Sequence, residues 1–225
     1  MINNLNQYID QTILKADAKI QEIATLIAEA KTYKFKAVCI NPYYVKYCAE
    51  KLKNTKIKIC TVIGFPLGAN ATTTKVFETK IAIANGANEI DVVINIGALK
   101  DQETNYVLQE LQAIRQVCSK DIILKVIIET ALLTEQEKII ACKLVSEAKA
   151  DFIKTSTGFV ANGGATVADV KLLKQHIAKN IAIKASGGIK TQEQALAMIA
   201  AGATRIGTSN GINIVTNQVK NSNSY

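Results

Sequence analysis

Ionisable residues interrupt several short apolar runs of this chain, at positions where a buried strand is expected to be apolar. Asp91 stands in EIDVVI, Lys154 in FIKTS and Lys184 in AIKAS, each next to an isoleucine. Side chains alternate between the two faces of a strand, so these three charges point inward if the isoleucines face a covering layer of helices. Asp10 in YIDQT has the same phase, and Lys125 lies within LKVII.

Two lysines that lie close together suggest covalent carbonyl chemistry. A neighbouring positive charge and partial burial both favour the neutral amine of a lysine near neutral pH. Such an amine attacks a carbonyl carbon and forms a Schiff base, which withdraws electrons from an adjacent carbon–carbon bond. A nearby carboxylate, here Asp91, can move protons while the imine forms. The group Lys154, Lys184 and Asp91 therefore predicts imine catalysis.

One alternative to this interpretation stays open at the level of the residues, and another is disfavoured. A buried charge is costly unless it is paired, so the three lysines and two aspartates can also form a structural ion-pair network. Metal-assisted chemistry is disfavoured, because the chain shows no His, Cys, Asp and Glu grouping with metal-ligand spacing. We therefore predict no metal site and no cofactor.

Two glycine-containing segments can supply an anion site. Ser186-Gly187-Gly188 follows one lysine-bearing run, and Gly207-Thr208-Ser209-Asn210-Gly211 opens a predicted helix. Glycines let backbone N–H groups approach an anion, and the start of a helix attracts negative charge. Together with the lysines, these segments predict a phosphate-bearing substrate.

To bring these residues together, the chain must form a sheet whose strands end at one face. The predicted strands are Tyr8–Thr12, Ala37–Ile40, Ile57–Ile63, Glu89–Ile94, Ile122–Ile128, Phe152–Thr155, Ile181–Ala185 and Arg205–Gly207. Segments of helical period lie between them, and strand–helix alternation implies parallel pairing. Eight such units predict a single α/β domain, a TIM (β/α)8 barrel over residues 1–225. An open doubly wound sheet is the alternative fold.

Composition excludes several classes of protein. Apolar residues make up 48% of the 225-residue chain and charged residues 20%, which is typical of a globular domain. The formal charge is +8, but 25 of the 27 basic residues are lysines scattered along the chain, so no nucleic-acid partner is predicted. We find neither a secretory signal nor an apolar run long enough for a membrane, and five cysteines without CxxC spacing favour reduced thiols in a cytoplasmic protein.

Motifs along nearly the whole chain resemble those of the deoxyribose-phosphate aldolase family. They are YIDQTILK, AVCINPYYV, TVIGFPLGA, NEIDVVINIGALK, LKVIIETALLT, ADFIKTSTGF, IKASGGIKT and RIGTSNG. The resemblance implies a cofactor-free class I aldolase that reversibly cleaves 2-deoxy-D-ribose 5-phosphate to D-glyceraldehyde 3-phosphate and acetaldehyde. It also implies that Lys154 forms the Schiff base, that Asp91 transfers protons and that Lys184 assists. Substrate or phosphate contacts are expected at Asp10, Thr157, Gly158, Gly187, Gly188, Gly207, Thr208 and Ser209.

The chain departs from the family pattern at three positions and ends in an unassigned aromatic residue. Gln11 stands where the family has His, Asn88 where it has Asp, and Asn210 where Ser is frequent. A flexible tail over about residues 219–225 ends in Tyr225, whose hydroxyl can reach over the barrel mouth and help move a proton at the acetaldehyde methyl carbon. A tail without a role is the alternative.

Other functions and partners complete the set of expectations. Another lysine Schiff-base barrel, such as a transaldolase-like enzyme or a dehydratase, would share the imine step, and a sugar-phosphate binding protein would lack it. We expect small phosphosugar and aldehyde substrates as partners, no nucleic acid and no membrane. Barrels of this kind often associate through surface helices, which makes a homodimer possible.

Overall fold

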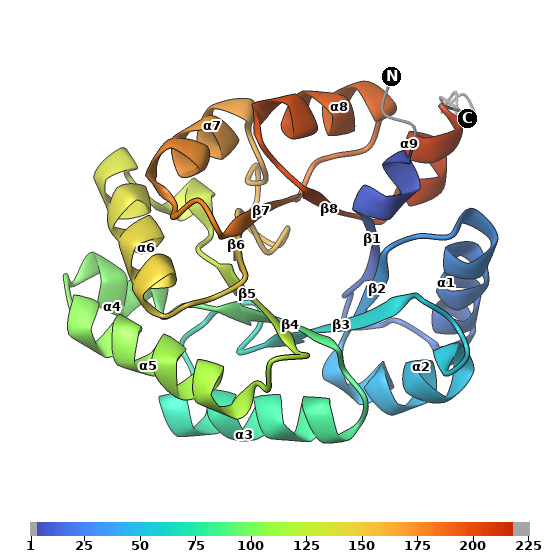
Figure 1. The fold of residues 1–225 in the computed structure, drawn as a ribbon, viewed down its shortest axis with the longest axis horizontal. Coiled ribbons are helices and arrows are strands. Elements are labelled where there is room, and N and C mark those ends of the chain that lie inside the picture. The colour runs from blue at the N-terminus through green and yellow to red at the C-terminus, as the bar shows by residue number, and fades with distance from the viewer. Residues whose placement is uncertain (1–3, 218–225) are drawn as a thin grey trace.

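Eight parallel strands close into a barrel in sequence order, β1 to β8, in a computed structural model that describes residues 4–217 (Figure 1). The strands are β1 (Ile9–Ile13), β2 (Ala37–Ile40), β3 (Lys58–Ile63), β4 (Glu89–Val93), β5 (Ile123–Ile127), β6 (Phe152–Lys154), β7 (Ala182–Ser186) and β8 (Arg205–Thr208). Strand β8 pairs with β1, so the sheet has no free edge. The predicted TIM barrel is confirmed, and the open doubly wound sheet is wrong.

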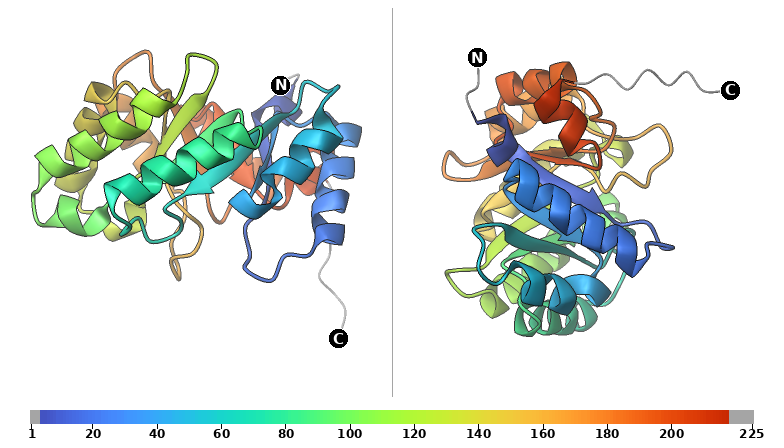
Figure 2. Two further views of the ribbon diagram at one scale, coloured as in Figure 1. Left: turned by 90° about the horizontal axis from the view of Figure 1, so that it is seen from below. Right: turned by 90° about the vertical axis from the view of Figure 1, so that its right-hand side faces the viewer.

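Helices surround the barrel on its outer side, as the ring in Figure 1 and the two side views in Figure 2 show. They are α1 (Ile20–Tyr33), α2 (Val45–Leu52), α3 (Thr72–Ala84), α4 (Ile96–Lys100), α5 (Thr104–Val117), α6 (Glu135–Glu147), α7 (Val167–His176), α8 (Gln192–Ala201) and α9 (Gly211–Thr216). No helix in the described part of the chain is long and apolar enough to cross a membrane.

Strand period decides which side chains enter the main core. Ile90 and Val92 on β4 belong to the large apolar cluster between strands and helices, whereas Asp91 between them lies in the barrel interior. A second, smaller apolar cluster comes from the opposite face of β2 and β3. It consists of Leu14, Ala37, Cys39, Cys60 and Val62, with Phe65 packed against it. The barrel interior is thus apolar on the β2–β3 side and charged elsewhere.

Apart from β2, every strand differs from its expected bounds by one residue at one or both ends, and three differences concern the neighbouring turns and helices. Residues Leu5–Tyr8 form a 3-10 turn, so β1 begins at Ile9 and not at Tyr8. Two helices follow β4 where one was expected, because Asn95 caps the short α4 and a turn then separates it from α5. Eleven residues, 156–166, lie between Thr155 and α7 without any helix. Tyr225 and the predicted tail lie outside the described residues.

Gly68, in the loop that follows β3, is held where no side chain fits. Its φ is +69°, a conformation that glycine adopts without strain. An added Cβ would lie 1.9 Å from the carbonyl oxygen of Ile94, which follows β4. The loop therefore approaches the neighbouring strand more closely than any other residue type permits.

Replacing Gly68 by Ala is expected to lower the free energy of unfolding by at least about 2 kcal/mol, because it adds both backbone strain and a clash. Gly97→Ala is the matched control, since an added Cβ there meets its nearest neighbour, the Asn95 side chain, at 3.5 Å. Urea denaturation measures both variants. Equal stability of the two variants would contradict this account of the loop.

Candidate active site

Lys154 ends β6 at the floor of a cavity of about 550 Å³ that opens at the C-terminal ends of the strands. Its side chain is 3% exposed, and its Nζ donates to Oδ2 of Asp91 over 2.8 Å. Asp91 comes from β4, two strands away in the barrel, and is fully buried. Lys154 is thus the buried amine that a small molecule in the cavity can reach.

Asp91 is shared by three ammonium groups. Its Oδ2 accepts from Lys184 over 2.7 Å as well as from Lys154, and its Oδ1 accepts from Lys125 over 2.8 Å. Burial alone would raise the pKa of this carboxyl group, but the three nearby lysines outweigh burial and hold the pKa well below its usual range. Asp91 is therefore ionised throughout the physiological pH range.

Beneath Asp91 the ion pairs continue toward the other end of the barrel. Lys184 contacts Asp10 over 2.5 Å, and Arg205 contacts Asp10 over 2.7 Å and Glu89 over 2.9 Å. Glu89 also contacts Lys125 over 2.6 Å, which connects these ion pairs back to Asp91. Burial opposes the charged form of Lys184, yet Asp10 and Asp91 hold its pKa well above the ordinary value.

The connected network holds four basic and three acidic side chains. They are Lys125, Lys154, Lys184 and Arg205 against Asp10, Glu89 and Asp91. The predicted phase of the charged residues is confirmed, and the ion-pair network offered as an alternative exists together with the accessible lysine. Glu89 and Arg205 were not assigned to the site, although both share the inward phase of their strands. Arg205 points away from the glycine loops, toward Asp10 and Glu89.

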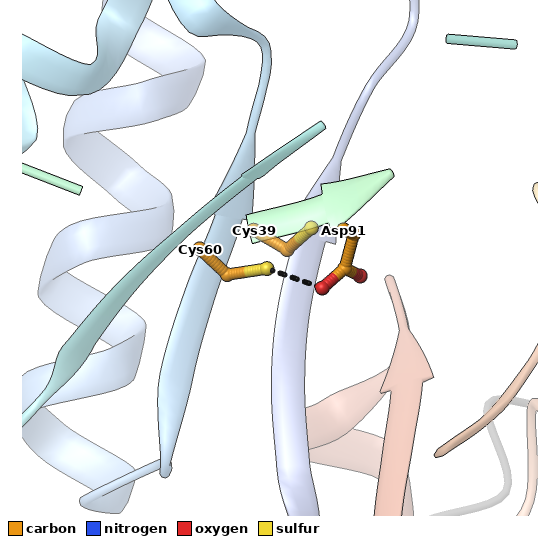
Figure 3. Close-up of side chains that lie close together, drawn as sticks. All are labelled: Cys39, Cys60 and Asp91. Atoms are coloured by element: carbon orange, nitrogen blue, oxygen red, sulfur yellow. Dashed lines mark hydrogen bonds between the residues drawn. The ribbon is translucent and has the colours of Figure 1, made fainter. Parts of the chain in front are cut away.

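Two neighbouring cysteines complete the interior beside Asp91 (Figure 3). Cys60 Sγ lies 3.0 Å from Asp91 Oδ1 and 3.3 Å from Lys125 Nζ, and Cys39 pairs with Cys60 in the strand register. Burial raises the pKa of the Cys60 thiol well above its ordinary value. The two sulfurs and a carboxylate oxygen lie within 4.8 Å of one another, but both oxygens of Asp91 already accept lysine N–H groups. A metal ion here would have to displace those lysines.

The glycine loops border the same cavity as Lys154. Of the residues expected to contact substrate, the cavity is lined by Thr157, Gly158, Gly187, Gly188, Gly207, Thr208 and Ser209. Asp10 is not among its lining residues, because its side chain is fully buried under Lys184 and Arg205.

Several backbone amides of these loops, which line the cavity, are available as hydrogen-bond donors. Gly187 and Gly188 have φ of +84° and +78°, so the chain after β7 turns sharply. Within residues 4–217, the amides of Gly187, Gly188 and Ser209 donate no hydrogen bond to another backbone carbonyl outside the regular elements. Such amides at a concave surface suit an anionic oxygen.

The departures from the family pattern fall in different places. Gln11 lies at the cavity edge, where its Oε1 accepts from the Gly211 amide over 3.0 Å and its Nε2 donates to Glu29 over 2.8 Å. Asn210 also lines the cavity. Asn88 precedes β4 and accepts from the Ile59 amide over 3.1 Å, at the opposite end of the strands.

Known proteins resemble this chain over nearly its full length. A model described as DeoC/LacD family aldolase matches residues 5–217. A deoxyribose-phosphate aldolase of Geobacillus sp. (strain WCH70) is 54% identical over 99% of this chain and 100% of that protein. One of Bdellovibrio bacteriovorus is 56% identical over 94% of this chain and 95% of its own length. The tetrameric deoxyribose phosphate aldolase structure from Aeropyrum pernix has a TM-score of 0.87 at 30% identity, covering 94% of this chain and 89% of that one.

The Asp10 carboxyl predicts a pH-dependent stability. Burial would raise its pKa, but Lys184 and Arg205 lower it from 3.8 to about 2. A depressed folded-state pKa stabilises the fold above the unfolded pKa and loses that contribution as the pH falls toward the folded value. At pH 7, Asp10→Asn should lower the free energy of unfolding by about 3–5 kcal/mol, because it removes one of the two carboxylate partners of each of the buried cations Lys184 and Arg205.

This difference between wild type and Asp10→Asn should shrink by about 2 kcal/mol as the pH falls from about 4 to 2. Urea titrations at stepped pH values measure it. Asp121→Asn, at an exposed position, is the control and should follow wild type at every pH. A difference that stays constant over this window would exclude an ionised Asp10 in the folded protein.

Proposed function

The chain belongs to the DeoC/LacD family of aldolases, and on that premise we propose that Lys154 forms the Schiff base of its reaction. The activity is that of a deoxyribose-phosphate aldolase, a lyase that cleaves 2-deoxy-D-ribose 5-phosphate to D-glyceraldehyde 3-phosphate and acetaldehyde. The observation that carries the residue assignment is the position of Lys154: it is the one network lysine that lines the cavity.

Charge balance and carboxylate contacts distinguish Lys154 from the other lysines of the network. Four basic groups face three carboxylates in the network, so the loss of one proton leaves it balanced. Lys125 and Lys184 each contact two carboxylates, whereas Lys154 contacts Asp91 alone. Lys154 is therefore the network lysine with the fewest carboxylate partners, and the proposed mechanism uses its amine to attack an aldehyde carbon.

The cleavage then proceeds on the imine. The Lys154 nitrogen bonds to C1 of the open-chain sugar, and water leaves after protonation of the carbinolamine oxygen. Removal of the C3 hydroxyl proton lets the C2–C3 bond break. The electron pair of that bond moves toward the imine and converts it into an enamine, and D-glyceraldehyde 3-phosphate departs. Protonation at C2 and hydrolysis release acetaldehyde and restore the amine. Asp91 lies beside Lys154 and is assigned the proton transfers of imine formation.

Lys184 acts through Asp91 and Asp10. It donates to the same Asp91 oxygen as Lys154 and holds both carboxylates in place. We propose that the positive charge of Lys184 gives the network one more cation than it has carboxylates. Lys184 is a positioning residue in this scheme, because it lies beneath the cavity and not in its lining.

The glycine loops are assigned to the phosphate group. Gly187, Gly188 and Ser209 supply backbone N–H groups at the cavity that contains Lys154, and Thr208 lies between them in the lining. A phosphate bound by these loops would orient the reacting carbons, because binding energy from a remote part of the substrate positions the reacting part. A proton-transfer role of Tyr225 and formation of a homodimer both stay predictions; light scattering on the purified protein tests the latter.

Lys154→Arg should lower retro-aldol activity by several orders of magnitude while the fold is retained, because a guanidinium stays protonated and forms no imine. The decisive measurement is borohydride reduction in the presence of acetaldehyde, followed by peptide mass spectrometry. A two-carbon adduct on Lys154 is expected in wild type and none in the variant. Adduct formation on Lys125 or Lys184 instead would overturn the assignment.

Lys184→Leu should move the acid limb of the pH–rate profile to higher pH. The substitution leaves three cations facing three carboxylates, so the remaining lysines hold their protons more strongly. The kcat profile with saturating substrate measures this shift. Lys100→Leu removes a half-exposed lysine that pairs with Glu137 on the surface, and as a control it should leave the limb in place. An unshifted limb in Lys184→Leu would exclude the charge-balance account.

A further inference from the structure

Glu129, immediately after β5, has a backbone conformation that is rare for a side-chain-bearing residue. Its φ is +52°, in the left-handed region. The Ile128 amide donates to the Lys154 carbonyl over 3.1 Å, and the Thr130 amide donates to the Thr155 carbonyl over 2.8 Å. In a regular parallel ladder, successive hydrogen bonds lie two residues apart on both strands. Here the donors lie two residues apart, at 128 and 130, but the acceptors lie only one residue apart, at 154 and 155. Glu129 is the extra residue, as in a β-bulge.

The bulge aims a buried carboxylate at the loop that follows the Schiff-base strand. Glu129 is 1% exposed, and its Oε2 accepts from the Thr157 amide over 2.9 Å and also from the Thr157 hydroxyl. Its Oε1 has no hydrogen-bond partner within residues 4–217. A strained backbone and a buried, half-satisfied carboxylate both lower stability, and such features concentrate at functional sites.

Thr157 transmits the position of Glu129 to the cavity. Its hydroxyl donates to Glu129 and accepts from the Phe159 amide over 3.1 Å, so the direction of both hydrogen bonds is fixed. Thr157 and Gly158 line the cavity together with Lys154. Gly158 lies against the glycine loop that follows β7, since a Cβ added at Gly187 would be 3.5 Å from the Cα of Gly158.

We propose that Glu129 is a positioning residue for the phosphosugar, and that it acts through Thr157. It holds the segment 157–159 so that Gly158 stays beside Gly187, and it binds the Thr157 proton so that this hydroxyl faces the cavity only as an acceptor for a substrate hydroxyl. This inference rests on the proposed function. The ligand class it serves is a phosphorylated hydroxyaldehyde, and acetaldehyde, which has neither phosphate nor hydroxyl group, does not depend on it.

Glu129→Ala should raise KM for 2-deoxyribose 5-phosphate by about tenfold or more, since charge-assisted hydrogen bonds to the loop are lost. Capture of acetaldehyde on Lys154 by borohydride should stay within about twofold of wild type, because that step uses no interaction with this loop. Thr157→Val should show the same separation of the two readouts, and it carries the test if Glu129→Ala fails to fold.

Thr130→Val is the matched control. Thr130 is the next residue, and its buried hydroxyl also lacks a hydrogen-bond partner within residues 4–217, so it forms no hydrogen bond with Thr157. It should leave KM unchanged. In Glu129→Ala/Thr157→Val the rise in KM should not exceed that of the larger single variant, because both act on one interaction.

Three results would overturn the inference: an equal rise in KM for Thr130→Val, additive effects in the double variant, or loss of acetaldehyde capture in parallel with the rise in KM. The last would assign Glu129 to general stability of the barrel. Failure of the proposed function itself is recognised separately, because wild type would then form no adduct on Lys154.

Discussion

One buried carboxylate, Asp91, accepts hydrogen bonds from three lysine ammonium groups, and the rest of the barrel interior is arranged around this sharing. An ion removed from water is costly unless opposite charges surround it. A single carboxylate cannot neutralise three cations, so Asp10 and Glu89 are placed beneath it, and Arg205 bridges those two. The network follows from this need for opposite charges, and Lys154, the network lysine that contacts a single carboxylate, lies where the cavity begins.

Barrel closure makes that network geometrically possible. Asp91 is opposite Lys125 in the register of β4 and β5, and Lys154 is opposite Lys184 in the register of β6 and β7. Shifting any of these strands by one residue would exchange the charged face with the isoleucine and valine face. The outer apolar cluster and the inner ion pairs therefore specify the same register, which ties the position of Lys154 to the packing of the helices.

Features that depend on the two-residue period of a strand could be predicted from the sequence. Features that depend on closure of the barrel could be predicted much less well. The alternation in EIDVVI predicted the inward position of Asp91, which its ion pair with Lys154 confirms. Arg205 and Asp10, by contrast, are 195 residues apart, and their pairing requires β8 to meet β1. The left-handed conformation of Glu129 has no local signal, because neither glycine nor asparagine marks the turn in VIIETALL.

The two-sided interior has a consequence for how substitutions combine. On the charged side, one residue serves several partners, so the energetic effect of a substitution depends on which other members are intact. On the β2–β3 side, Ala37, Cys39 and Val62 contribute to an apolar cluster, where effects come from volume and shape. We expect single substitutions to accumulate on the β2–β3 side, whereas residues on the charged side can change only together. The charged half of the barrel interior thus resists single substitutions, and the apolar half is open to gradual remodelling.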